Sequence, residues 1–184
     1  MNKIGRLFQV TIFGESHGSS VGVLVDGMPA GIKVDETDFI SDLARRKAGG
    51  LGTTSRIEDD KVIIESGVYN GHTTGGAILL RFQNKNTISK DYSKLVTHPR
   101  PSHADFVANK KYHGFNDYRG GGSFSGRLTL GLVAAGVLAK KILTNLNFST
   151  KIVNLGGQTA KNKYSDLLKE VVDKKDSVGG IVEI

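Results

Sequence analysis

The chain has 184 residues, with 25 lysines and arginines against 18 aspartates and glutamates, which gives a formal net charge of +7 at pH 7. A hydrophobic content of 38% argues against disorder, and the length suits a single domain with a full core. The absence of cysteine excludes disulfides and thiolate metal sites. The sequence has neither an apolar run long enough to span a membrane nor the pattern of a signal peptide, so we expect a cytoplasmic protein.

The first part of the chain predicts two strands around a polar loop, followed by a helix. β-branched and apolar residues favour strands at 6–13 and 21–25, and GESHGSS between them predicts a loop. Residues 34–47 have the pattern of an amphipathic helix with Asp35 as N-cap and an apolar face of Phe39, Leu43 and Ala44. We expect this helix to be ended by Gly49, Gly50 and Gly52.

The rest of the chain alternates irregularly between strands and helices. Strands are predicted at 61–65, 76–82 and 151–155, and the final residues GGIVEI have the pattern of a buried strand. Helices are predicted at about 103–112, with Ser102 as cap, at 126–146 and at 165–173. Hairpin-like strand pairs favour an α+β fold over a doubly wound parallel sheet.

Three segments contain residues suited to chemistry. In the first, GESHG (residues 14–18), glycines flank His17, and a histidine exchanges protons near neutral pH. We therefore consider His17 a candidate for proton transfer, the alternative being an ordinary loop histidine.

The second segment is RPSHAD (residues 100–105). A helix capped by Ser102 would place His103 in its first turn, where anions are favoured, and Arg100 could clamp a phosphate or carboxylate. His72, His98 and His113 lack such surroundings and are predicted to face solvent, and no metal-ligand spacing is present.

The third segment is RGGGSFSGR (residues 119–127). Three glycines allow backbone N–H groups to approach an anion closely, and the serines and flanking arginines add donors and charge, so we favour a phosphate loop over a flexible turn. Arg45, Arg46 and Lys47 at the preceding helix end are read first as a solvated basic terminus and alternatively as a contact for acidic substrate groups.

The net charge indicates an anionic partner, and two classes remain open at this point. A small phosphorylated ligand agrees with the framed histidines and arginines. A nucleic-acid-binding module is the alternative, although the lysines are scattered and interrupted by acidic residues, and clustered aromatic residues for base stacking are missing.

Taken together, these motifs resemble those of the chorismate synthase family. The resemblance covers residues 4–184 and includes FGESHGSSVGVLVDGMPAG, ARRKAGG, SGVYNGHTTGGAI, RPSHAD (family RPGHAD) and RGGGSFSGR (family RGGGRSSAR). It implies helices sandwiched between antiparallel sheets and a homotetramer when the chain is full length.

The resemblance also implies an activity and roles for individual residues. The family's reaction is a 1,4-anti elimination of phosphate that converts 5-enolpyruvylshikimate 3-phosphate to chorismate with reduced FMN, with NADPH as a possible flavin reductant and with no nucleic acid or membrane partner. Positions matching the family's catalytic residues are His17 and His103. Positions matching its substrate ligands are Arg45, Arg46, Arg100 and Arg127. Positions matching its FMN contacts are Arg46, Ser123, Phe124 and Ser125.

The chain also departs from the family. Ser123 and Phe124 replace an arginine and a serine, and Gly52 stands near a position where the family has a ligand arginine, with Arg56 as the nearest substitute. The family is about twice this length, so we expect residues 1–184 to be an N-terminal portion that by itself neither binds FMN tightly nor turns over. A relic that kept the fold and lost activity is a further alternative.

Overall fold

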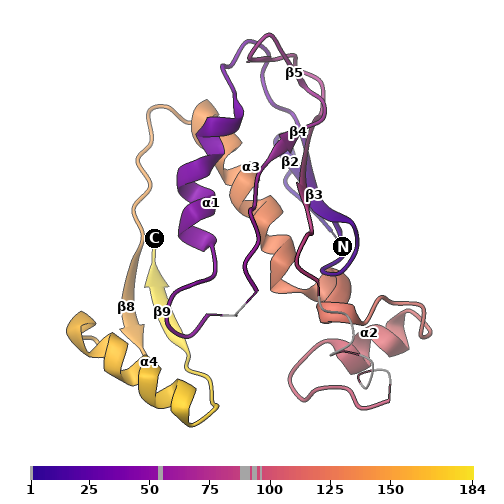
Figure 1. Ribbon diagram of the computed structural model, residues 1–184. Coiled ribbons are helices and arrows are strands. Elements are labelled where there is room, and N and C mark those ends of the chain that lie inside the picture. Colours follow the sequence, from indigo (N-terminus) through magenta and orange to yellow (C-terminus); the bar gives the residue numbers. More distant parts are fainter. Residues whose placement is uncertain (1, 54–55, 88–91, 93–94, 96) are drawn as a thin grey trace. The chain divides into compact units, whose positions relative to one another are not determined.

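The computed structural model describes residues 2–53, 56–87, 92, 95 and 97–184 (Figure 1). The contacts divide the chain into two compact units. The first comprises the chain up to Lys47 together with Glu58–Leu143, and the second comprises Ala48–Ile57 together with Thr144–Ile184. All three segments singled out in the sequence belong to the first unit.

An antiparallel sheet forms the base of the first unit. Its strand order is β1-β2-β3-β7-β4, where the strands are β1 (Lys3–Ile4), β2 (Gln9–Gly14), β3 (Ser20–Asp26), β7 (Ile78–Gln83) and β4 (Ile63–Ile64). The register pairs Val23 with Leu80. Alternate residues of β3 and β7 are fully buried on one face, namely Val21, Val23, Val25, Ile78, Leu80 and Phe82. Antiparallel pairing confirms the predicted α+β class.

Two helices of the first unit pack against each other, and the longer also packs on the sheet (Figure 1). Helix α1 (Ile40–Arg46) follows a 3-10 turn, η1 (Glu36–Phe39), and helix α3 (Thr129–Ile142) follows η4 (Gly126–Leu128). Apolar burial joins them: Phe39, Leu43, Leu130, Ala134 and Leu138 belong to the same core as the sheet valines. The predicted helix at 126–146 therefore exists but is shorter.

The start of the predicted helix at 34–47 is confirmed, and its end differs. Asp35 accepts a hydrogen bond from Thr37 N while Asp38 accepts one from Asp35 N, which forms a capping box. The helix ends at Arg46 because Lys47 turns to an extended backbone, with ψ of 141°, before the glycines are reached. Ala44 is exposed rather than part of the buried face.

The predicted helix at 103–112 begins later than expected. Helix α2 spans Asp105–Lys111, and its N-cap position is Ala104. Ser102 lies in the left-handed region, with φ of 61°, and does not cap the helix. His103 consequently precedes the helix and is not in its first turn. The other elements among the described residues of this unit are the hairpin strands β5 (Val68–Tyr69) and β6 (His72–Thr73) and the 3-10 segment η3 (Arg119–Phe124).

The second unit contains a two-stranded antiparallel sheet and a helix. Strands β8 (Lys151–Leu155) and β9 (Gly180–Glu183) pair with an irregularity between Ile152 and Asn154, and η5 (Lys161–Lys163) leads into α4 (Tyr164–Asp173). The expectation of a buried final strand is wrong, because all four residues of β9 are exposed. The described side chains of the second unit are partly buried at most, and they do not form a closed hydrophobic core.

Candidate functional site

The His17 loop and the glycine loop of residues 119–127 lie against each other. Ser16 N donates to Gly122 O at 3.1 Å. A Cβ atom at position 120 would lie 2.5 Å from His17 Cδ2 and 2.8 Å from Ser16 Oγ. Gly120 also has a left-handed backbone, with φ of 58°, so both space and conformation require glycine at this position.

His17 is buried beneath these contacts, with 8% of its surface exposed. Its ring meets Tyr92 edge to face, with 5.0 Å between ring centroids. The Arg100 guanidinium lies 5.9 Å from the centroid of the same tyrosine ring. Tyr92 therefore links the first and second predicted segments. Its position, alone in a polar stretch of the sequence, gave no signal of this role.

Arg100 is held by Asp105 at the start of α2. Its backbone N and its Nε donate to Asp105 Oδ2 at 3.0 and 2.8 Å, and its Nη2 donates to Oδ1 at 2.9 Å. These hydrogen bonds hold the pKa of Asp105 below its usual value and raise the pKa of Arg100. Asp105, which sequence reasoning left without a role, thus fixes the direction of the guanidinium.

A cleft of about 220 Å³ lies between the Arg100 segment and the glycine loop. It is lined by Arg100, His103, Ala104, Asp105, Gly120, Gly121, Phe124, Ser125 and Gly126. Phe124 is half exposed, and its ring lies 6.2 Å from that of Tyr112. Of the three adjacent positions predicted to contact a cofactor, Phe124 and Ser125 line this cleft, whereas the exposed Ser123 is not among the lining residues.

Two of the predicted arginines share one buried carboxylate. Arg127 Nη1 hydrogen-bonds Asp60 Oδ1, and Arg46 Nη1 donates to Asp60 Oδ2 at 3.1 Å. The side chains of Asp60 and Arg127 are 4% and 7% exposed. Burial is the main factor lowering the pKa of Arg46; Asp60 opposes this and Arg127 adds to it. Because guanidinium groups stay protonated, this cluster of two arginines and one aspartate carries one net positive charge.

Asn84, at the end of β7, connects this cluster to the His17 loop. Its Oδ1 accepts from Arg127 Nε at 3.1 Å, and its Nδ2 donates to Glu15 O at 3.0 Å and Gly18 O at 2.9 Å. Sequence reasoning missed Asn84 and Asp60. Neither was assigned a role from the sequence, and each hydrogen-bonds a residue more than sixty positions away.

The other predicted residues lie outside this group of contacts. The Arg45 side chain is 71% exposed and lies 3.8 Å from Asp42, in a cleft of about 360 Å³ that also includes Arg46 and Lys140. Arg119 pairs with Asp117, and this bond lowers the pKa of Asp117. Arg56 belongs to the second unit. His72, His98 and His113 are exposed, as predicted.

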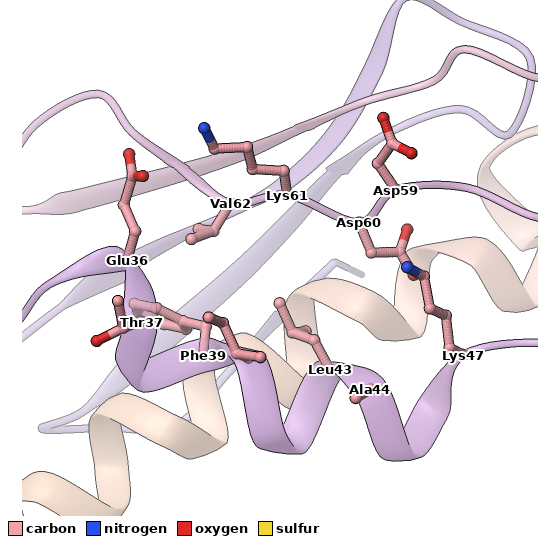
Figure 2. A pocket seen from close by; sticks show the side chains of 11 residues that line it. Glu36, Thr37, Phe39, Leu43, Ala44, Lys47, Asp59, Asp60, Lys61 and Val62 are labelled. Carbon is pink, nitrogen blue, oxygen red and sulfur yellow. The ribbon is translucent and has the colours of Figure 1, made fainter.

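A further cleft of about 370 Å³ opens between α1 and residues 59–62 (Figure 2). Phe39, Leu43, Ala44 and Val62 give it an apolar floor, and charged side chains stand at its rim. Asp60 borders this cleft and also belongs to the arginine cluster. The predicted catalytic, substrate and cofactor residues are all absent from its lining.

The described residues contain neither a candidate metal site nor a candidate membrane-spanning helix. No group of three or more histidine, cysteine, aspartate or glutamate side chains there is arranged to hold a metal ion. Nor does the described part of the chain contain a helix long and apolar enough to cross a membrane.

Comparisons with known proteins agree on one family. A sequence model of chorismate synthase matches residues 8–184. The chain is 57% identical to chorismate synthase of Chitinophaga pinensis over its whole length, which is 54% of that relative. It is 41% identical to the enzyme of Dehalococcoides mccartyi, covering 99% of this chain and 57% of the relative.

A crystal structure of chorismate synthase matches with a TM-score of 0.68 at 22% identity, over 96% of this chain and 57% of that one, so the fold is shared. The chain thus spans a little over half the length of the curated relatives it matches. The comparisons give no support to the nucleic-acid alternative.

Proposed function

Because this chain belongs to the chorismate synthase family, we propose that it carries part of an active site that converts 5-enolpyruvylshikimate 3-phosphate to chorismate and phosphate. One observation carries the proposal: His17, Arg100 and the glycine loop, which are far apart in the sequence, lie together in the first unit. A substrate with a phosphate and two carboxylates requires such a combination of proton donor, cations and backbone donors.

In this proposal His17 is the proton donor to the departing phosphate. The carbon–oxygen bond to phosphate breaks and its electron pair leaves with the phosphate. A ring carbon–hydrogen bond also breaks: its electron pair forms the new ring double bond and its proton passes to a base, so no net oxidation or reduction occurs. His17 donates a proton to the phosphate oxygen. Its burial against Gly120 and Tyr92 keeps water away from the imidazole, which strengthens the interaction with an anion.

The cleft beside the glycine loop has the chemistry expected for a flavin mononucleotide. Arg100 and His103 offer cationic and hydrogen-bonding groups, Gly120 and Gly121 expose backbone, and Phe124 offers an aromatic ring, so the residues suit a phosphate attached to a flat ring system. When bound, reduced FMN would supply an electron transiently. We assign His103 to holding a proton beside it and Ser125 and Phe124 to contacting it.

The arginines would bind the acidic groups of the substrate. Arg100 is directed by Asp105 and lines the cleft, and Arg46 shares the Asp60 carboxylate with Arg127. Arg45 lies on the same helix as Arg46, and we assign it a longer-range contact to the acidic groups of the substrate. Its side chain is exposed, and its nearest distance to Asp42 is 3.8 Å.

A chimeric enzyme tests the proposal. This chain replaces the matched segment of the Chitinophaga pinensis chorismate synthase, to which it is 57% identical. With reduced FMN we expect the folded chimera to form chorismate, and the His17→Ala and His103→Ala versions to lose most turnover while keeping their fold. A matched His98→Ala control, at an exposed histidine, should retain activity. A folded chimera that makes no chorismate would refute the proposal.

The proposal also covers the cellular location, the reductant of the flavin and the oligomeric state. We place the protein in the cytoplasm, with NADPH as a reductant for the flavin and a homotetramer as the assembly of the whole enzyme. Light scattering of the chimera and chorismate formation with NADPH in place of chemical reductants would check the last two.

A further inference from the structure

The turn that holds His17 is closed by an asparagine from another strand. Within the turn, Gly18 N donates to Glu15 O at 3.0 Å. Asn84 Nδ2 donates to both carbonyls that bracket Ser16 and His17, those of Glu15 and Gly18. Asn84 N also donates to Ser19 O at 3.0 Å, so backbone and side chain of one residue hold the whole turn against β7.

The other end of the Asn84 amide is fixed by Arg127. Asn84 Oδ1 accepts from Arg127 Nε, and the same guanidinium bonds Asp60 through Nη1 and contacts Gln83 O through Nη2 at 3.5 Å. Asp60 and Arg127 are buried, and close packing in a protein interior restricts their side chains, so the Arg127 guanidinium sets the rotation of the amide. The amide orientation in turn determines that N–H groups, rather than an oxygen, face the two carbonyls.

We propose that Asn84 is a positioning residue for His17, and that Arg127 acts on His17 through Asn84. The proposal rests on the proposed function only in treating His17 as the proton donor to phosphate. It gives Arg127 a second role beside the substrate contact that family resemblance implies. A small displacement of a catalytic imidazole is costly, since a shift of about 1 Å can lower a rate by roughly a hundredfold.

The test is the imidazole NMR spectrum of His17 in this chain, with the signal assigned from a His17→Gln variant. Asn84→Asp keeps the shape and the acceptor for Arg127 Nε but removes both donors to the turn. We expect the His17 signals to shift or broaden while those of His72, His98 and His113 stay in place. Gln83→Glu makes the same change of amide to carboxylate one residue earlier at an exposed position, and it should leave His17 unchanged.

Two further measurements separate positioning from general damage. Thermal unfolding checks that Asn84→Asp is folded; if it is not, Asn84→Ala, which introduces no charge, is examined in the same way. His17 signals that overlay those of the unchanged chain in a folded variant would overturn the proposal, and so would unfolding of both variants, because Asn84 would then be a structural residue.

In the chimera, Asn84→Asp should lower kcat by about tenfold to a hundredfold with KM unchanged, because the substrate contacts remain while the proton donor is displaced. A raised KM with unchanged kcat would contradict positioning. If the chimera with Asn84 intact is inactive, the proposed function fails while the NMR result still decides the role of Asn84.

Discussion

Gly120 shows most clearly how a single residue shapes the candidate site. We predict that Gly120→Ala destabilises the fold more than Gly121→Ala. Both have left-handed backbones, which cost alanine roughly 1–2 kcal/mol. Only at position 120 would the new methyl group also lie 2.5 Å from His17, and overpacking of this kind adds about 1–3 kcal/mol. Denaturant unfolding of the two variants measures the difference, and equal losses would contradict the close contact.

The Arg100–Asp105 pair predicts a dependence of stability on pH. Because the pKa of Asp105 is lowered in the folded chain, its contribution is present at neutral pH and is lost as the pH falls below about 4. The gap in unfolding free energy between the unchanged chain and Asp105→Asn should therefore narrow on acidification. Arg100→Gln should remove the same pH dependence, and combining both variants should add no further change. A gap that stays constant from pH 7 to 3 would argue against the ion pair.

Residues in local motifs could be predicted from the sequence, and residues that act over long separations could not. His17, Arg100 and the glycine loop stand beside their own framing residues, so the sequence alone indicates their chemistry. Tyr92, Asn84 and Asp60 gain their roles only when distant segments meet, as when Asn84 reaches Glu15 across 69 positions. A single sequence has no signal for such pairs.

At the scale of elements, α3 packs closely on the sheet at Gly131. A Cβ atom at position 131 would lie 3.0 Å from Gly22 O and 3.2 Å from Val23 Cβ, whereas one at position 136 would meet nothing within 4 Å. We predict that Gly136→Ala stabilises the protein by up to about 1 kcal/mol through helix propensity. Gly131→Ala should destabilise it despite the same gain, because the backbone of β3 cannot yield. Thermal unfolding measures whether each variant is more or less stable than the unchanged chain. Stabilisation by both variants would show that α3 can move.

Element boundaries were predicted well where side chains cap locally and poorly where tertiary bonds intervene. The capping box at Asp35 and Asp38 lies within four residues, and the structure contains it. At Ser102 the capping pattern was misleading, because Asp105 is bonded to Arg100 and the intervening residues form a turn instead of a first helical turn. The ion pair outweighs the preference of serine for the N-cap position.

At the scale of the molecule, the two units differ in how much apolar surface they bury. The first has a core with many fully buried side chains, whereas every described residue of 48–57 and 144–184 is at least partly exposed. We predict that amide hydrogens of β8, β9 and α4 exchange faster than those of β3, β7 and α3, because local opening costs less where little is buried. Hydrogen-exchange mass spectrometry resolves these segments, and equal protection would contradict the difference.

The bonds that Asn84 and Arg127 make also bear on when the site can form. Asn84 lies 69 residues from Glu15, and Arg127 lies 67 residues from Asp60. Closing loops of that length is entropically unfavourable, and folds dominated by such non-local pairings assemble slowly. During synthesis the His17 turn is made early, but its anchors are translated much later. We therefore expect the candidate site to form late in folding, so refolding experiments that follow His17 should report the last step rather than the first.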